Sequence, residues 1–147
     1  LADPDHRIVA ADYLGRLRIP EARLPLERLL QARDKAVRAA AVRALGQIDV
    51  REGLGALTSA ALEDPASNVR ETAVIALGKS THSDAVPALV AISQGGDPAL
   101  AALARRSIRK LRIHAALPEL RRQSRQLPLV KRLPYWYAAA AIKSRGR

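Results

Sequence analysis

Several residue types are missing or scarce in this chain of 147 residues, and each absence narrows what the chain can do. Cysteine, methionine and phenylalanine are absent, and one tryptophan and three tyrosines supply all the aromatic side chains. Without cysteine, the 147 residues can form no disulfide and no thiolate metal site, and they contain no cysteine nucleophile. The longest apolar candidate for a membrane span, residues 135–142, is far shorter than the roughly 20 residues that a helix needs to cross a bilayer. We therefore expect no membrane span, and we take the cytoplasm as the compartment.

Acidic residues are scarce in the last third of the chain. Residues 1–96 contain 12 Lys/Arg and 12 Asp/Glu, whereas residues 97–147 contain 13 Lys/Arg and only two acidic residues, Asp97 and Glu119. The whole net charge of +11 therefore belongs to residues 97–147. Such an uneven charge distribution predicts that residues 97–147 bind a negatively charged partner. This partner is an acidic protein, a nucleic acid or an anionic membrane surface.

One motif recurs along the chain and predicts the architecture. The pattern Val-Arg-x-x-Ala-x-x-Ala-Leu-Gly is found at residues 37–46 and again at residues 69–78. Three sets of positions share one register with intervals of 31 or 32 residues, namely Arg7, Arg38 and Arg70, then Gly15, Gly46 and Gly78, and finally Leu26, Leu57, Leu89 and Leu120. Such a period is typical of solenoids built from helical hairpins. The single extra residue falls before Arg70, and we place it in the turn at residues 64–68 because turns accept insertions easily.

Each unit of the repeat predicts two antiparallel helices. The first helix carries the repeated leucine, in ranges close to 20–32, 51–63, 84–94 and 115–125. The second helix follows an aspartate whose side chain can accept hydrogen bonds from the free amide groups of the first turn, and these residues are Asp3, Asp34, Asp64 and Asp97. We expect Gly46 and Gly78 to end second helices in the left-handed conformation. Pro128 and Pro134 break the pattern. We therefore divide the chain into a repeat array, residues 1–126, and a basic C-terminal segment, residues 127–147, with a short capping helix.

The motif resembles HEAT repeats of the short kind found in phycobilin lyase-type proteins. The matching residues are Asp34, Val37, Arg38, Ala41, Ala44, Leu45 and Gly46, and again Asp64, Val69, Arg70, Ala73, Ala76, Leu77 and Gly78. The resemblance implies an all-α fold, a right-handed α-α superhelix of about four helix pairs plus a C-terminal capping helix. It also implies that the repeat arginines pair with Asp34 and Asp64, and that the second helices line the concave side. On that arrangement the chain starts with the second helix of a unit whose first helix is missing, so we expect a piece of a longer chain.

The second helices place two lines of residues beside their apolar stripe. In the register, Asp12, Arg43, Ile75 and Arg106 form one line, and Ala11, Val42, Val74 and Arg105 form the next. An apolar middle with a basic far end, where Arg109 also lies, predicts a groove for a peptide or a helix. The alternative is that Val42 and Val74 pack between adjacent units. The same basic residues are also spaced to follow a nucleic-acid backbone.

The three consecutive aromatic residues 135–137 predict either a terminal cap over the last unit or a binding anchor, since tryptophan and tyrosine are common at interface hot spots. The candidate partner-binding residues are therefore Arg43, Val74, Ile75, Arg105, Arg106, Arg109 and Trp136.

No residues that carry chemistry converge in the sequence. There is no glycine-rich phosphate loop and no nucleophile with a base, and His82 and His114 lie in turns of successive units, too far apart for one metal ion. We therefore expect no catalytic, cofactor-binding or metal-binding residue, and a non-catalytic scaffold that binds an acidic protein partner. The alternative is a nucleic-acid-binding module that uses the basic C-terminal helices. The resemblance raises a third, enzymatic interpretation, because phycobilin lyase-type proteins handle a tetrapyrrole and some DNA glycosylases are built of HEAT-like units. We set it aside, since no residues in this sequence carry either activity and pigment attachment would require a partner.

Overall fold

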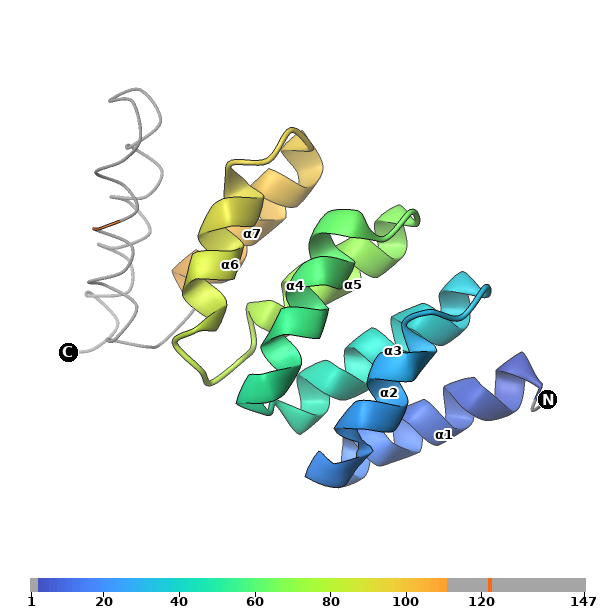
Figure 1. Ribbon diagram of the computed structural model, residues 1–147. Helices are drawn as coiled ribbons and strands as arrows, with labels where there is room; N and C mark the ends of the chain where they lie inside the picture. Colours follow the sequence, from blue (N-terminus) through green and yellow to red (C-terminus); the bar gives the residue numbers. More distant parts are fainter. Residues whose placement is uncertain (1–2, 111–121, 123–147) are drawn as a thin grey trace. The chain divides into compact units, whose positions relative to one another are not determined.

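The structure is a computed structural model that describes residues 3–110 and Arg122. All regular elements in this part of the chain are helical (Figure 1). In chain order they are α1 (Pro4–Leu17), η1 (Pro20–Ala22), α2 (Arg23–Leu29), α3 (Lys35–Ile48), η2 (Arg51–Gly53), α4 (Leu54–Glu63), α5 (Ser67–Leu77), α6 (Ala85–Ser93) and α7 (Pro98–Lys110). The expected all-α solenoid class is confirmed. The chain divides into an N-terminal unit, residues 1–76, and a C-terminal unit, residues 77–147. The boundary expected after residue 126 lies outside the described residues.

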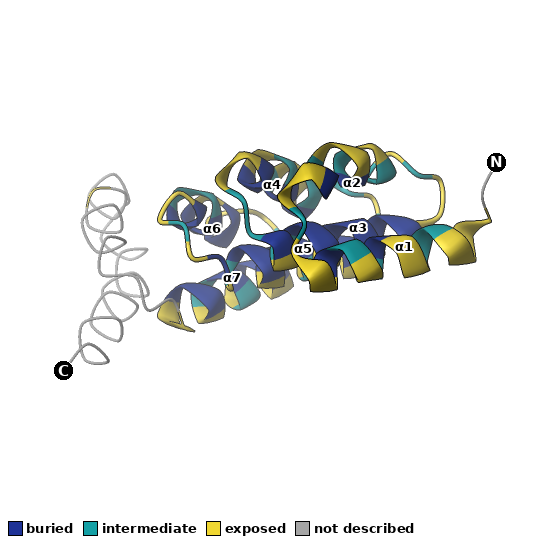
Figure 2. Cartoon of the chain, turned by 90° about the horizontal axis from the view of Figure 1, so that it is seen from below, coloured by how far each residue is buried: buried dark blue, intermediate teal, exposed yellow. Residues whose placement is uncertain are grey.

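The N-terminal unit consists of two layers of helices. The second helices α1, α3 and α5 lie side by side in one layer, and the first helices α2 and α4 form the other (Figures 1 and 2). The buried faces of the two layers are turned toward each other (Figure 2). The repeated leucines Leu26 and Leu57 are 0% and 3% exposed, and Val37 and Val69 of the facing layer are equally buried. Each such side chain contributes about 1.5–3 kcal/mol by leaving water, so the core runs between the layers as the register predicts.

Gly15 and Gly46 lie inside α1 and α3 and allow close helix packing, whereas Gly78 directly follows the last residue of α5. Gly46 lies inside α3, and no glycine in the described residues has a positive φ. A Cβ atom on Gly46 would lie 2.6 Å from the Cβ of Ala76, and one on Gly15 would lie 2.7 Å from the Cα of Ala44. The expectation that the repeat glycines end the helices in the left-handed conformation is therefore wrong. Asp49, with a φ of 50°, takes that conformation at the end of α3.

The turn before α5 contains the extra residue of the 32-residue interval. Asp34 and Asp97 directly precede their helices, and each accepts a hydrogen bond from the amide two residues later, at 2.7 and 3.0 Å. Asp64 also accepts from the amide two residues later, at 2.9 Å, but that amide belongs to Ala66, which still precedes α5. Its predicted capping role is therefore wrong. The longer turn leaves the Asp64 side chain free to reach the preceding unit of the repeat.

The C-terminal unit is described as far as α7. Helix α6 is apolar along most of its length and packs against α7. Leu89 of α6 and Ala104 and Ile108 of α7 are at most 1% exposed and form the core of this unit. No helix in residues 3–110 is both long and apolar enough to cross a membrane.

Candidate functional site

Two of the predicted partner-binding residues lie at the surface of the N-terminal unit, on the layer of second helices. Nη2 of Arg43 donates a hydrogen bond to Oδ1 of Asp12 at 3.2 Å, and these side chains are 46% and 36% exposed. The contact confirms that α1 and α3 are aligned as the register predicts. Ile75, on the neighbouring helix α5, is 43% exposed. This surface, which we call the inner strip, therefore consists of an exposed ion pair and an exposed isoleucine.

Val74 does not belong to the inner strip. Both Val42 and Val74 are 0% exposed. The interpretation that these two valines pack between adjacent units, and do not line a groove, therefore holds. Successive residues of a helix point about 100° apart, which is why Ile75 faces outward while Val74 faces the core. As a core residue, Val74 has no surface to offer a partner.

The basic residues of α7 differ in their surroundings. Arg106 and Arg109 are exposed, whereas Arg105 is half-buried and its Nη1 donates a hydrogen bond to the carbonyl oxygen of Ser93 at 3.2 Å. This bond links α7 to the end of α6, which gives Arg105 a structural contact within its own unit. Trp136 lies outside the described residues, as do most of the basic residues that follow α7.

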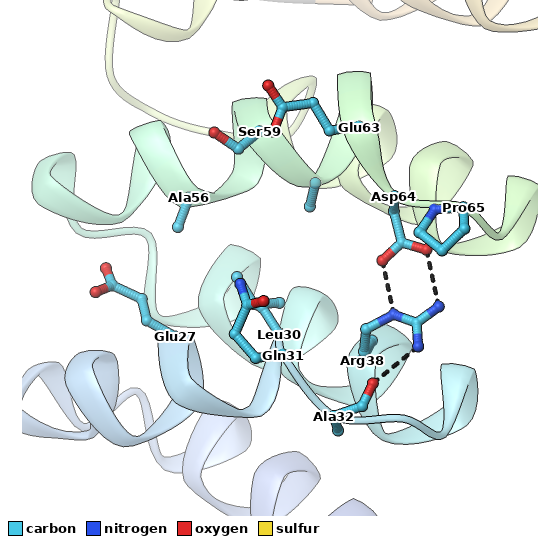
Figure 3. Close-up of a pocket in the computed structure, with 11 residues that line it drawn as sticks. Glu27, Leu30, Gln31, Ala32, Arg38, Ala56, Ser59, Glu63, Asp64 and Pro65 are labelled. Atoms are coloured by element: carbon cyan, nitrogen blue, oxygen red, sulfur yellow. Dashed lines mark hydrogen bonds and ion pairs between the residues drawn. The ribbon is translucent and has the colours of Figure 1, made fainter.

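A groove that the sequence did not predict lies between α2 and α4, on the layer of first helices. It has a volume of about 570 Å³. Its lining residues are Glu27, Leu30, Gln31, Ala32, Arg38, Ala56, Ser59, Ala60, Glu63, Asp64 and Pro65. Figure 3 shows Arg38 and Asp64 at one end and Glu27 toward the other. The repeat pattern says which residues are buried but not how far apart the first helices lie, so nothing in the sequence signalled this groove.

The ion pair at the end of this groove is nearly buried and joins two successive units of the repeat. Nε and Nη2 of Arg38 donate to Oδ2 and Oδ1 of Asp64 at 2.8 and 3.0 Å, and the two side chains are only 10% and 7% exposed. Nη1 of Arg38 donates to the carbonyl oxygens of Ala32 and Arg33 at 2.9 and 3.0 Å. Arg70 repeats this last contact, since its Nη1 donates to the carbonyl oxygen of Asp64 at 2.9 Å. The expected pairing of a repeat arginine with Asp64 is confirmed.

The pair keeps both side chains charged. The hydrogen bond to Asp64 raises the pKa of Arg38 above its ordinary value; burial works against this rise, and the charges of Asp64 and Asp34 add to it. Burial by itself would raise the pKa of Asp64, but hydrogen bonds from Arg38 and the Ala66 amide, with the charges of Arg38 and Arg70, hold it below its ordinary value. A carboxylate held in this way is a poor proton donor or acceptor near neutral pH. The pair is therefore a charged bridge between Arg38 of α3 and Asp64 in the turn before α5.

Known proteins resemble this chain in sequence and in fold. The family model for HEAT repeats matches residues 1–78 and 23–109. The phycocyanobilin lyase subunit alpha of Synechococcus elongatus is 39% identical over 111 residues, which are 69% of this chain and 40% of that protein. The chain thus spans about two fifths of the length of this curated relative. A solved complex of CpcE and CpcF of phycocyanin lyase from Nostoc has a TM-score of 0.61 at 21% identity, and the match covers 92% of this chain and 90% of that chain. This second likeness shows the α-α solenoid fold.

The curated relative overturns two expectations from the sequence. It is by name a subunit of a lyase, so the expected non-catalytic scaffold, with its nucleic-acid alternative, is wrong, and so is the expectation that the chain has no enzymatic role. The error has a physical reason. The repeat motif consists of the positions that stack the helices, and those positions carry no information about what the exposed positions between them bind.

Proposed function

This chain belongs to the family of HEAT-repeat proteins, and we propose that it is the repeat module of a lyase subunit that takes part in attaching a phycobilin to a protein. The observation that carries the proposal is the 39% identity to the phycocyanobilin lyase subunit alpha over 111 residues. The enzymatic alternative, which the resemblance to phycobilin lyase-type proteins implied, thus replaces the scaffold.

The inner strip of the N-terminal unit has the chemistry that a bilin requires. A bilin is an open-chain tetrapyrrole with apolar rings and two carboxylate side chains. Arg43 offers a guanidinium group that is 46% exposed, and Ile75 offers an exposed apolar side chain on the next helix. Asp12 accepts a hydrogen bond from Nη2 of Arg43, which leaves other N–H groups of the guanidinium for a carboxylate. We assign the carboxylate contact to Arg43 and the contact with a pyrrole ring to Ile75.

The proposed contribution to the reaction is positioning. Asp12 and Arg43 are already joined at 3.2 Å, an arrangement that holds the guanidinium in place for a bound carboxylate. A module that holds the bilin in one orientation beside the acceptor protein accelerates attachment, because it converts an encounter in solution into a reaction within a complex.

A protein partner is the second part of the proposal. The structural neighbour is a complex of two proteins, CpcE and CpcF, which supports a partner of this kind for a subunit with the same fold. Arg106 and Arg109 are exposed on α7, in the part of the chain that carries the whole net positive charge. We assign these two side chains to an acidic surface of the partner, where they would speed association and select the orientation.

The test is a titration of this chain into phycocyanobilin, followed by the absorption spectrum of the pigment. We expect a saturable spectral change, and we expect Arg43→Ala to weaken the affinity about tenfold because a charge-assisted hydrogen bond is lost. Ile75→Ala should weaken it less, through lost apolar contact. Lys35→Ala is the matched control, since Lys35 is an exposed cation at the start of the same helix. Equal affinities of the Arg43 and Lys35 variants would exclude the inner strip as the site, and an unchanged spectrum would contradict bilin binding altogether.

A further inference from the structure

Two further polar side chains follow the inner strip one helical turn later. Arg16 stands four residues after Asp12 on α1, and Gln47 stands four residues after Arg43 on α3, at the equivalent position of the repeat. Residues four apart lie on the same side of a helix, so Arg16 and Gln47 share the surface of the inner strip. Both residues are exposed. This surface therefore offers more hydrogen-bond donors than the single guanidinium group that the proposed function uses.

The side chain of Gln47 reaches across from α3 to α1. A Cβ atom on Gly15 would clash with Oε1 of Gln47, so this side chain lies over the glycine. Arg43 makes the same crossing one turn earlier, where its Nη2 donates a hydrogen bond to Asp12 at 3.2 Å. A glutamine amide has two N–H donors, and residues four apart on a helix are neighbours. Arg43 and Gln47 can therefore donate hydrogen bonds to the same carboxylate.

The position of Arg16 faces the surface inside the repeat array as well as at its end. Gln47 occupies the same repeat position and is exposed although α1 lies beside α3 (Figure 1). Packed helices are about 8–10 Å apart, so Arg16 stands about one such spacing across from Arg43 and about 5 Å further along the helix axis. A bilin carries its two carboxylates on neighbouring pyrrole rings. Two long cationic side chains at this separation can therefore reach one carboxylate each.

We propose that the inner strip selects a tetrapyrrole with two carboxylates, and that Arg16 and Gln47 provide this selection. Arg43 and Gln47 hold one carboxylate between them, and Arg16 holds the second. This inference rests on the proposed function, because it takes a bilin as the ligand, and it adds the two carboxylates as the feature that is recognised. Contacts from two helices fix the pigment along the strip, whereas a single contact would let it rotate about Arg43.

Titrations of the 147-residue chain into phycocyanobilin and into its dimethyl ester, followed by absorption, test the selection. The ester has no charged carboxylate, so we expect it to bind at least about tenfold more weakly than the free acid. Gln47→Glu places a like charge beside the bound carboxylate. It should therefore weaken the binding of the free acid about tenfold and leave that of the ester unchanged. Gln31→Glu is the matched control, because Gln31 is an exposed glutamine beside the groove between α2 and α4.

The outcomes of these titrations separate this proposal from the proposed function. A wild-type chain that binds the free acid and the ester equally well overturns the selection but leaves the inner strip as a bilin site. Equal affinities of the Gln47 and Gln31 variants for the free acid overturn the role of Gln47. A chain that binds neither pigment contradicts both proposals.

Double variants test how the two carboxylates are shared. Arg16→Ala should weaken the binding of the free acid about tenfold, whereas Arg28→Ala, which removes another exposed arginine from the last turn of its helix, should have no effect. Arg16 and Arg43 bind different carboxylates, so their losses should multiply to about a hundredfold. Gln47→Ala and Arg43→Ala act on one carboxylate, so their combined loss should be smaller than the product.

Circular dichroism checks that each of these variants remains helical. An affinity of the Arg16 variant equal to that of the Arg28 variant overturns the contact between Arg16 and the second carboxylate. Losses that multiply fully for Arg43 and Gln47 overturn the shared carboxylate.

Discussion

The ion pair between Arg38 and Asp64 permits a sharp prediction about the stability of the repeat array. Asp64→Ala removes both oxygens that accept hydrogen bonds from Arg38 at 2.8 and 3.0 Å, in a place where the two side chains are only 10% and 7% exposed. The guanidinium keeps its bonds to two turn carbonyls but loses its counter-charge. Breaking a buried pair on one side costs about 3–5 kcal/mol, and the remaining carbonyl bonds place the expected loss near the lower limit, at about 3 kcal/mol.

The same structure supplies a matched comparison. Asp12 and Arg43 also join neighbouring helices of successive units, but their side chains are 36% and 46% exposed. Water replaces the lost contact there, so Asp12→Ala should cost less than about 1 kcal/mol. Urea denaturation followed by circular dichroism gives both losses, provided that the slope of the transition is unchanged. Equal losses in the two variants would refute the reasoning, since burial would then not decide the strength of these pairs.

Three further predictions concern the acid response and the packing of the second helices. Gly46→Ala should destabilise the chain by about 1–3 kcal/mol, because the added methyl group would lie 2.6 Å from the Cβ of Ala76 on α5. Gly55→Ala should stabilise the chain by about 0.5–1 kcal/mol, because no atom lies within 4 Å of the added methyl group. Chemical denaturation measures both changes in the free energy of unfolding. The pKa of Asp64 is lowered in the folded chain, so its contribution is complete above its ordinary pKa of about 3.9 and is lost as the pH falls through the folded value. The stability difference between the wild type and Asp64→Ala should therefore shrink on acidification, and a constant difference would contradict the pKa shift. Val74→Ala should cost about 2 kcal/mol of stability, while Ile75→Ala should change the stability by less than about 0.5 kcal/mol.

The fold could be predicted from the sequence because the stacking of helical hairpins leaves a periodic trace. Leu26 and Leu57 occur once in each unit and are buried, as the register requires. The role of the repeated glycines could not be predicted, because a glycine that ends a helix and a glycine that admits a neighbouring helix look alike in a sequence. Only the distance between Gly46 and Ala76 distinguishes the two.

The candidate site was harder to predict, because binding surfaces use the positions that the repeat leaves variable. Arg43 and Ile75 were correctly assigned to the surface, but Val74, one residue before Ile75, is buried, and a small error in helical phase is enough to exchange two such residues. The groove between α2 and α4 depends on the separation of the first helices, which no single position encodes. The proposed function rests on a relative, since a motif of stacking residues is shared by HEAT proteins of many functions.

The central claim is that this chain is a repeat module of a bilin lyase subunit, and the most direct test replaces the matching region of a known one. In a chimera of the Synechococcus elongatus phycocyanobilin lyase, this chain would substitute for the matching 40% of subunit alpha, and the covalent attachment of phycocyanobilin to apo-phycocyanin would be measured. We expect attachment clearly above the background without subunit alpha, and a loss when Arg43→Ala is introduced. A chimera that folds but attaches pigment only at that background rate would contradict the account.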